Sequence, residues 1–275
     1  MAMASVTGQP SVVRVGDAAF HVRRDGPWTT DAPALVFANS LGTDFRVWDA
    51  LLGELAGRYR VLRYDKRGHG LSTLTPGPYA MDDLVGDLAA LMDAEDLQDA
   101  VVVGLSIGGM IAQGLAAARP DLVSGLVLMD TAHKIGTDEI WDERIAAVRA
   151  GGVEAIADAV MTRWFTPTFH ARRADELGLW RTMLVRTPVE GYLGCSLAIR
   201  NADLTEATSG LALPTLCMAG DQDGSTPVDV VRATAELIVG ARMEVVVDAG
   251  HLPGVEQPQA VARLVEDFLR DMGHG

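Results

Sequence analysis

The sequence is poor in cysteine. Its 275 residues include only Cys195 and Cys217, which lie in different segments. Two separated cysteines do not make a disulfide framework, and this usage predicts a reducing, cytoplasmic compartment. Neither cysteine belongs to a Cys/His cluster with metal-ligand spacing, so we expect no metal site, and no glycine-rich phosphate loop is present.

Positive charge and long apolar runs are also scarce. The chain carries 23 Lys and Arg against 37 Asp and Glu, which gives a net charge of −14. A negative balance of this size disfavours nucleic acids and anionic membranes as partners. No stretch approaches the roughly 20 apolar residues of a membrane span. Residues 1–10 carry neither a basic region nor an apolar run, so we expect no signal peptide.

Short, β-branched apolar runs alternate with amphipathic helical patterns along most of the chain. The predicted strands cover residues 12–15, 18–22, 34–38, 60–64, 100–103, 123–130, 213–220 and 243–247. This alternation predicts an α/β fold with an eight-stranded, mostly parallel sheet flanked by helices. Residues 132–208 break the alternation with several amphipathic helices and no convincing strand. We therefore predict a core of residues 1–131 and 209–275 with an inserted helical cap at 132–208.

The segment Gly104-Leu105-Ser106-Ile107-Gly108-Gly109 lies between a predicted buried strand and a predicted helix. A G-x-S-x-G sequence in that position is a nucleophile elbow, a turn so sharp that only glycines tolerate the backbone contacts around the serine. The turn lifts the Ser106 hydroxyl above the sheet and directs the Ile107 N–H toward a developing oxyanion. The alternative is that a Gly/Ser loop matches this short pattern by chance. A base and an acid placed to act on Ser106 would favour the nucleophile elbow over a chance match.

A serine nucleophile needs a base, and after this elbow the partners follow in the order serine, acid, histidine. His251 follows the strand predicted over residues 243–247, so it lies at the same edge of the sheet as Ser106. We therefore predict His251 as the base. The other five histidines have weaker contexts, in turns, after strands or near the termini: His21, His69, His133, His170 and His274.

Two aspartates follow the strand predicted over residues 213–220, and only one of them can reach the histidine. The Gly-x-x-Asp spacing and the following Pro227, which suits the first turn of a helix, favour Asp223. Asp221 is then a turn or capping residue. Asp130, at the end of another predicted strand, is a third candidate for the acid.

The second donor of an oxyanion hole is expected from the loop after the strand at residues 34–38. That loop begins with Asn39-Ser40, where hydrolases of this type usually have His-Gly. The Leu41 N–H would complete the hole together with the Ile107 N–H. Each preorganised donor of this kind contributes about 10²–10³ in rate.

Six segments carry a resemblance that spans nearly the whole chain: Asn39–Asp44 with Trp48, Arg67–Ser72, Gly104–Ile111, Lys134–Thr137 with Trp141, Arg163–Phe165 and Gly250–Pro253. They resemble the α/β-hydrolase superfamily and, within it, the 3-oxoadipate enol-lactonases. The first and fourth segments are the most specific, whereas the elbow and the Arg-Gly-His-Gly loop are shared across the superfamily. His133 is a departure, because the family more often has a small residue there.

The resemblance implies the α/β-hydrolase fold and the hydrolysis of 3-oxoadipate enol-lactone to 3-oxoadipate, in the β-ketoadipate pathway of aromatic degradation. It implies a triad of Ser106, Asp223 and His251, with Leu41 and Ile107 as oxyanion donors, acting through an acyl-enzyme without a cofactor. The substrate would be a small, anionic, five-membered lactone that bears a carboxymethyl group.

An anionic substrate needs local positive groups on a protein with this net charge. Each candidate could equally lie on a solvated helix face: Lys134, Arg144 and Arg163 in the cap, followed by Arg200 and Arg67. Trp141 is either a wall of the substrate pocket or part of the cap core.

Two other functions use the same sequence features. A carboxylesterase or a carbon–carbon bond hydrolase could carry the same triad beneath a more apolar pocket, and it would prefer simple aryl esters to the enol lactone. A non-catalytic ligand-binding protein on this fold would show a broken triad or oxyanion loop. Every catalytic element is present, so the sequence favours an enzyme.

Overall fold

The computed structural model describes residues 8, 10–29, 32–55 and 57–274. The expected absence of a signal peptide concerns residues 1–10, most of which lie outside this range. Within it, no helix combines the length and the apolar character that crossing a bilayer requires. Cys195 and Cys217 are buried free thiols.

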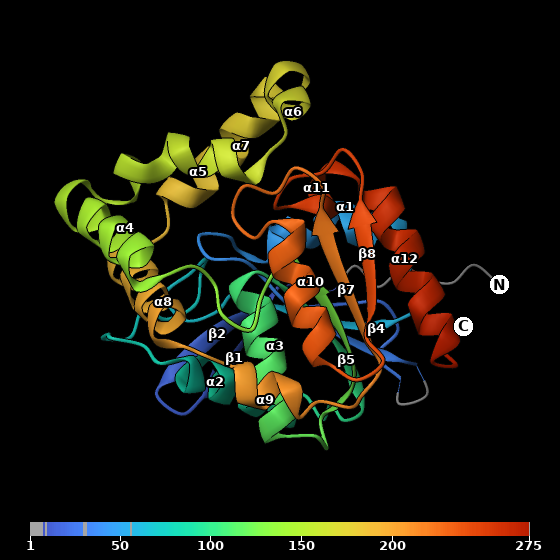
Figure 1. Cartoon of the computed structure of the whole chain (residues 1–275). Coiled ribbons are helices and arrows are strands. Elements are labelled where there is room, and N and C mark those ends of the chain that lie inside the picture. Colours follow the sequence, from blue (N-terminus) through green and yellow to red (C-terminus); the bar gives the residue numbers. More distant parts are fainter. Residues whose placement is uncertain (1–7, 9, 30–31, 56, 275) are drawn as a thin grey trace.

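Within the described residues an eight-stranded sheet forms the centre of the protein (Figure 1). Its strand order is β1-β2-β4-β3-β5-β6-β7-β8. β2 pairs antiparallel with β1 and β4, and the other neighbours pair in parallel, as the sequence predicts. The bounds are β1 Ser11–Val15, β2 Ala18–Asp25, β3 Ala34–Ala38, β4 Arg60–Tyr64, β5 Ala100–Leu105, β6 Val123–Met129, β7 Thr215–Gly220 and β8 Arg242–Val246.

The strands follow the β-branched runs closely. β3, β5 and β7 are buried along their whole length, as expected of parallel strands covered on both faces. β7 begins at Thr215 rather than at residue 213, because Pro214 has no N–H to donate to the sheet. β8 ends at Val246, and Val247, which the pattern predicts as strand, is 67% exposed.

Helices cover both faces of the sheet (Figure 1). One set packs together as α2 Met81–Ala94, α3 Ile107–Ala118, α9 Thr205–Ser209 and α10 Val228–Leu237. The other set comprises η1 Phe45–Trp48, α1 Asp49–Glu54, α11 Pro253–Glu256 and α12 Pro258–Asp271. α12 buries Val261, Val265 and Phe268, which stand at the i, i+4 and i+7 positions of one helix face.

The segment between β6 and β7 is helical, and Figure 1 shows most of it to one side of the sheet. It forms α4 Asp138–Gly151, η2 Val153–Ile156, α5 Ala157–Trp164, α6 Pro167–Arg172, α7 Ala174–Val185 and α8 Val189–Asn201, and then α9. None of its described residues forms a strand, as the sequence predicts. We call α4 to α8 the cap helices. The division of the chain into a core of 1–131 and 209–275 and a cap of 132–208 stays a prediction. α9 lies at the end of the predicted cap range, but it packs against α3 and α10 beside the sheet.

Two glycines allow β5 to turn directly into α3. A Cβ at Gly104 would lie 2.4 Å from the Gly108 carbonyl oxygen, and a Cβ at Gly108 would lie 1.9 Å from the Ala38 carbonyl oxygen. Both distances are far below van der Waals contact, and backbone atoms cannot rotate out of the way. Only glycine therefore permits α3 to cross β3 at this point.

We expect Gly108→Ala to lower the free energy of unfolding by about 3 kcal/mol or more, because the added methyl group overlaps the Ala38 backbone. Gly86→Ala is the matched control. Gly86 is exposed on α2, and a Cβ there meets no atom within 4 Å, so this change should raise the free energy of unfolding by about 0.5–1 kcal/mol. Urea unfolding followed by circular dichroism measures both, and equal stability of Gly108→Ala and wild type would contradict the close crossing.

Candidate active site

Ser106 lies at the turn between β5 and α3. Its φ and ψ are 57° and −120°, a sparsely populated region for a residue with a side chain. Two hydrogen bonds hold this turn: Ser106 N–H donates to Met129 O (3.0 Å), and Thr131 Oγ1 donates to Ser106 O (2.6 Å). The strained turn is therefore fixed from the neighbouring strand β6 and the loop after it.

His251 follows β8 in a loop that is tied to the cap. Its N–H donates to Trp164 O at the end of α5 (2.9 Å), and the preceding Gly250 N–H donates to Glu256 Oε1 (2.7 Å). The imidazole is buried, and its Nδ1 lies 2.9 Å from Asp223 Oδ2. When Nδ1–H donates to this carboxylate, Nε2 is left free to accept a proton.

Asp223 lies in the loop after β7 and is the carboxylate that reaches His251. Its Oδ2 also accepts from Thr226 Oγ1 (2.7 Å), and its Oδ1 accepts from Ser225 N–H (2.7 Å). Burial raises the pKa of Asp223, but the charge of His251 and these hydrogen bonds together lower it below its usual value. The carboxylate therefore stays ionised while it orients the imidazole.

The other two candidate acids have different surroundings. Asp221 is exposed, and its Oδ1 accepts from Ala249 N–H (3.2 Å), so it joins the loop after β7 to the loop after β8 rather than capping a local turn. Asp130 is buried beside Asp223, and its Oδ1 accepts from Gly220 N–H (2.8 Å). Burial and the charge of Asp223 raise the pKa of Asp130 well above its usual value, which favours the neutral acid. The pKa values of the two buried carboxyl groups are thereby pushed apart.

Asp130, Asp223 and His251 also form the group of possible metal ligands among the described residues, with ligand atoms within 4.8 Å of one another. The hydrogen bond between His251 and Asp223 accounts for the short distance between two of these three side chains. Because the imidazole and the carboxylate are bonded to each other, the arrangement is suited to taking a proton from a serine hydroxyl.

Ser106 and His251 line a cavity of about 420 Å³ between the sheet and the cap helices. Ser40 and Leu41, from the loop after β3, line it beside them. Ile107 begins α3 next to Ser106. The positions of Leu41 and Ile107 are suitable for the predicted role of their N–H groups as oxyanion donors. That role stays a prediction.

A wider groove of about 1490 Å³ lies between α7 and the segment around η1. Among the described residues that line it there is no serine or cysteine. Its histidine, His21, is bonded through Nδ1 to Asp65 Oδ2 (2.8 Å). The smaller cavity is therefore the candidate active site, because it holds both a nucleophile and a base.

Arg144 and Arg163 line the smaller cavity, and neither forms an ion pair with an acidic side chain in the described part of the chain. Burial and the charge of Arg144 lower the pKa of Arg163, as expected when two like charges lie near each other. The Arg144 guanidinium lies 4.8 Å from the centre of the Trp141 ring, and Trp141 Nε1 donates to Ile135 O (2.7 Å). Trp141 is thus a fixed wall of a cavity whose positive groups can hold an anion.

The other candidate cations do not line this cavity. Each forms an ion pair outside it: Lys134 with Asp203, Arg200 with Asp142, and Arg67 with Asp87. Substrate binding by Lys134 stays a prediction, and in this structure its half-exposed side chain instead places Nζ 3.2 Å from a surface carboxylate. His133 does not line the cavity either, and its N–H and Nδ1 each lie 3.0 Å from Thr234 Oγ1.

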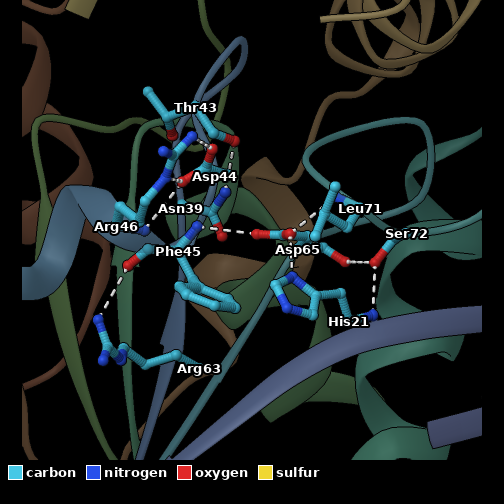
Figure 2. A network of polar contacts seen from close by, with 10 residues as sticks. All are labelled: His21, Asn39, Thr43, Asp44, Phe45, Arg46, Arg63, Asp65, Leu71 and Ser72. Atoms are coloured by element: carbon cyan, nitrogen blue, oxygen red, sulfur yellow. Dashed lines mark hydrogen bonds and ion pairs between the residues drawn. The ribbon is translucent and has the colours of Figure 1, made fainter. Parts of the chain in front are cut away.

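The loop that carries Ser40 and Leu41 is fastened to a buried carboxylate (Figure 2). Asp65 accepts hydrogen bonds from three different segments, through Phe45 N–H (2.9 Å), Leu71 N–H (3.0 Å) and His21 Nδ1 (2.8 Å). Figure 2 also shows Asn39 Nδ2 donating to Thr43 O (2.6 Å) within the loop. The shape of the loop is therefore held by several contacts at once.

Sequence reasoning missed three residues that support this site. Thr226 donates to the Asp223 carboxylate, and Glu256 holds the loop of His251. Thr226 follows the candidate acid, and Glu256 follows the candidate base, each within five residues. This closeness in the sequence is a signal by which they could have been predicted. Lys66, whose contacts with the loop after β3 are described below, stands in a polar Asp-Lys-Arg run typical of an exposed loop. No local signal marks it as buried.

Comparisons with known proteins find relatives over most of the chain. Residues 35–264 match the alpha/beta hydrolase family. 3-Oxoadipate enol-lactonase 2 of Acinetobacter baylyi is 37% identical over 240 residues, which cover 87% of this chain and 90% of that protein. 3-Oxoadipate enol-lactonase 1 of the same organism is 32% identical over 251 residues, 91% of this chain and 93% of that protein. The crystal structure of the enol-lactonase from Burkholderia xenovorans is 38% identical, with a TM-score of 0.91 over 94% of this chain and 100% of that one.

Asp223→Asn keeps the shape of the side chain but removes the charge that selects the His251 tautomer, so we expect kcat to fall by about 10⁴. Asp130→Asn replaces an acid that burial already favours as neutral, and Asp221→Asn changes an exposed turn residue, so both should keep most of the wild-type kcat. Hydrolysis of 4-nitrophenyl acetate, with folding checked by circular dichroism, measures all three variants. A larger loss in either control than in Asp223→Asn would contradict the assignment of the acid.

Proposed function

Because the chain belongs to the alpha/beta hydrolase family, and within it to the 3-oxoadipate enol-lactonases, we propose that it hydrolyses 3-oxoadipate enol-lactone to 3-oxoadipate. The same relationship makes it an ester or lactone hydrolase. One observation carries the proposal: a single cavity is lined by Ser106, His251 and two arginines, Arg144 and Arg163. A lactone that bears a carboxylate requires both a nucleophile and a cation.

In the proposed reaction Ser106 Oγ attacks the lactone carbonyl carbon while His251 Nε2 takes the hydroxyl proton. The Leu41 and Ile107 N–H groups hold the resulting oxyanion. Collapse of the tetrahedral intermediate breaks the ring C–O bond, and the leaving enol takes the proton from His251 and tautomerises to the ketone. Water then loses a proton to His251 and attacks the acyl carbon. The second tetrahedral intermediate collapses, the bond between that carbon and Ser106 Oγ breaks, Oγ takes the proton back from His251, and 3-oxoadipate is released.

Anion binding is the step that the net charge of the chain makes difficult. At −14 the protein as a whole repels a carboxylate. Arg144 and Arg163 reverse this locally, because two neighbouring positive charges that form no ion pair within the described residues favour the approach of an anion. A charge-assisted hydrogen bond to a carboxylate contributes about 1.5–3 kcal/mol. This supports a substrate of the small anionic class that the β-ketoadipate pathway provides.

Ser106→Ala should leave the fold intact, because it removes one oxygen from the wall of the cavity, and it should lower kcat by about 10⁶. The loss of enol-lactone absorbance on ring opening measures the rate, and circular dichroism checks the fold. If the variant kept more than one hundredth of the wild-type activity, Ser106 would not be the nucleophile.

Arg144→Ala and Arg163→Ala test recognition of the carboxylate. We expect the variant that loses the carboxylate partner to have a kcat/KM for the enol lactone lower by roughly 10–150-fold. A neutral ester of similar size makes no such contact, so its kcat/KM should change little. Arg200→Ala is the matched control, because its guanidinium is paired with Asp142 outside the cavity.

Steady-state kinetics on both substrates separates the outcomes. If neither cavity variant distinguishes the lactone from the neutral ester, these arginines do not recognise the carboxylate. A general carboxylesterase would then be the better description of the enzyme.

A further inference from the structure

Lys66 follows β4, and its ammonium group is buried against the loop after β3. The residue is 2% exposed. Its Nζ donates to Ser40 O (2.6 Å) and lies 3.3 Å from Asn39 O. In the described part of the chain it forms no ion pair with a carboxylate. Burying an unpaired charge is costly, so the hydrogen bonds to these carbonyl groups are the contacts that compensate it.

The carbonyl that Lys66 binds belongs to the peptide group that also carries the Leu41 N–H. In a planar trans peptide the C=O and N–H bonds point in opposite directions. A cation that holds the Ser40 carbonyl on one side therefore directs the Leu41 N–H to the other side. Leu41 and Ser106 line the same cavity.

We propose that Lys66 is a positioning residue for the oxyanion hole, and that its ammonium orients and polarises the Ser40–Leu41 peptide so that the Leu41 N–H stabilises the tetrahedral intermediate. A positive charge on the carbonyl oxygen withdraws electrons from the peptide and strengthens its N–H as a donor. The proposal rests on the serine mechanism proposed above, because it requires Leu41 to be an oxyanion donor.

Thr43 is the other residue that acts on this carbonyl. Its Oγ1 donates to Ser40 O (2.9 Å), and so does its N–H (3.3 Å). Both donors are neutral, so only Lys66 brings a charge. Figure 2 shows that the loop is also held by Asp65 through Phe45 and by Asn39 through Thr43. Removing the charge should therefore change the strength of the oxyanion hole more than the shape of the loop.

Four ionisable groups face Lys66 from the elements around it: Cys195 on α8, Asp65 and His69 in its own loop, and Asp44 before η1. Burial raises the pKa of the Cys195 thiol to about 12. Burial and the charge of Lys66 lower the pKa of His69 well below its usual value. Burial also lowers the pKa of Lys66 to about 8, so its ammonium loses its proton as the pH rises through that value. Since the charge is then lost, kcat should fall to a lower plateau.

The test compares Lys66→Met, Lys66→Arg and Thr43→Val with wild type, using 4-nitrophenyl acetate from about pH 7 to 10 with background hydrolysis subtracted. At pH 7, Lys66→Met should lower kcat by about tenfold to a hundredfold with little change in KM, less than the 10²–10³ lost when an oxyanion donor itself is removed. Its kcat should no longer fall near pH 8. Lys66→Arg should restore most of the activity and also abolish the fall, because a guanidinium stays charged. Thr43→Val should lower kcat less and keep the fall near pH 8.

A purely structural role for Lys66 predicts different results. It would lower stability, change KM together with kcat, and leave the fall near pH 8 in place, and these results would overturn the proposal. If Lys66→Met does not fold, the comparison of Lys66→Arg with wild type decides: a fall of kcat with pH in the wild type that Lys66→Arg lacks supports the proposal, and the same profile in both proteins refutes it. Ser106→Ala in the same ester assay separates the two proposals, because activity retained there would refute the serine mechanism itself.

Discussion

The backbones of α3 and β3 meet at Gly108, where a Cβ would lie 1.9 Å from the Ala38 carbonyl oxygen. This contact sets the position of the first turn of α3, and with it Ser106 and the Ile107 N–H. Because Ala38 is the last residue of β3, the loop over residues 39–41 starts beside the same contact. The proposed nucleophile and both proposed oxyanion donors therefore depend on one rigid crossing, which is the preorganisation that oxyanion stabilisation requires.

The cap helices contact the loops of Asp223 and His251 through the end of α5. Arg163 O accepts from Gly224 N–H (3.2 Å), next to Asp223, and Trp164 O accepts from His251 N–H (2.9 Å). The same Arg163 lines the cavity. The cation proposed to bind the substrate and the base proposed to activate the serine are thus joined through adjacent backbone groups. The end of α5 therefore helps to fix the positions of both residues.

Burial sets the charge of the ionisable groups around this site. Asp223 keeps its charge because His251 and neighbouring hydrogen bonds stabilise it, whereas Asp130 beside it is favoured as the neutral acid. Lys66 bears a charge that burial makes easy to lose. Each of these groups would titrate differently in water, so the chemistry of the site belongs to the packed structure rather than to the side chains alone.

The fold and the order of the candidate catalytic segments follow from local features of the sequence. The β-branched runs and the G-x-S-x-G turn are local signals, because strand periodicity and the steric demand of glycine act within a few residues. Tertiary packing instead determines which cations line the cavity: Arg163 lines it, whereas Lys134 pairs with Asp203, 69 residues away. It also determines that Lys66 is buried, although its polar neighbours predict exposure. Burial and ion pairing arise between segments that meet only when the cap and the sheet pack, and no local pattern encodes those contacts.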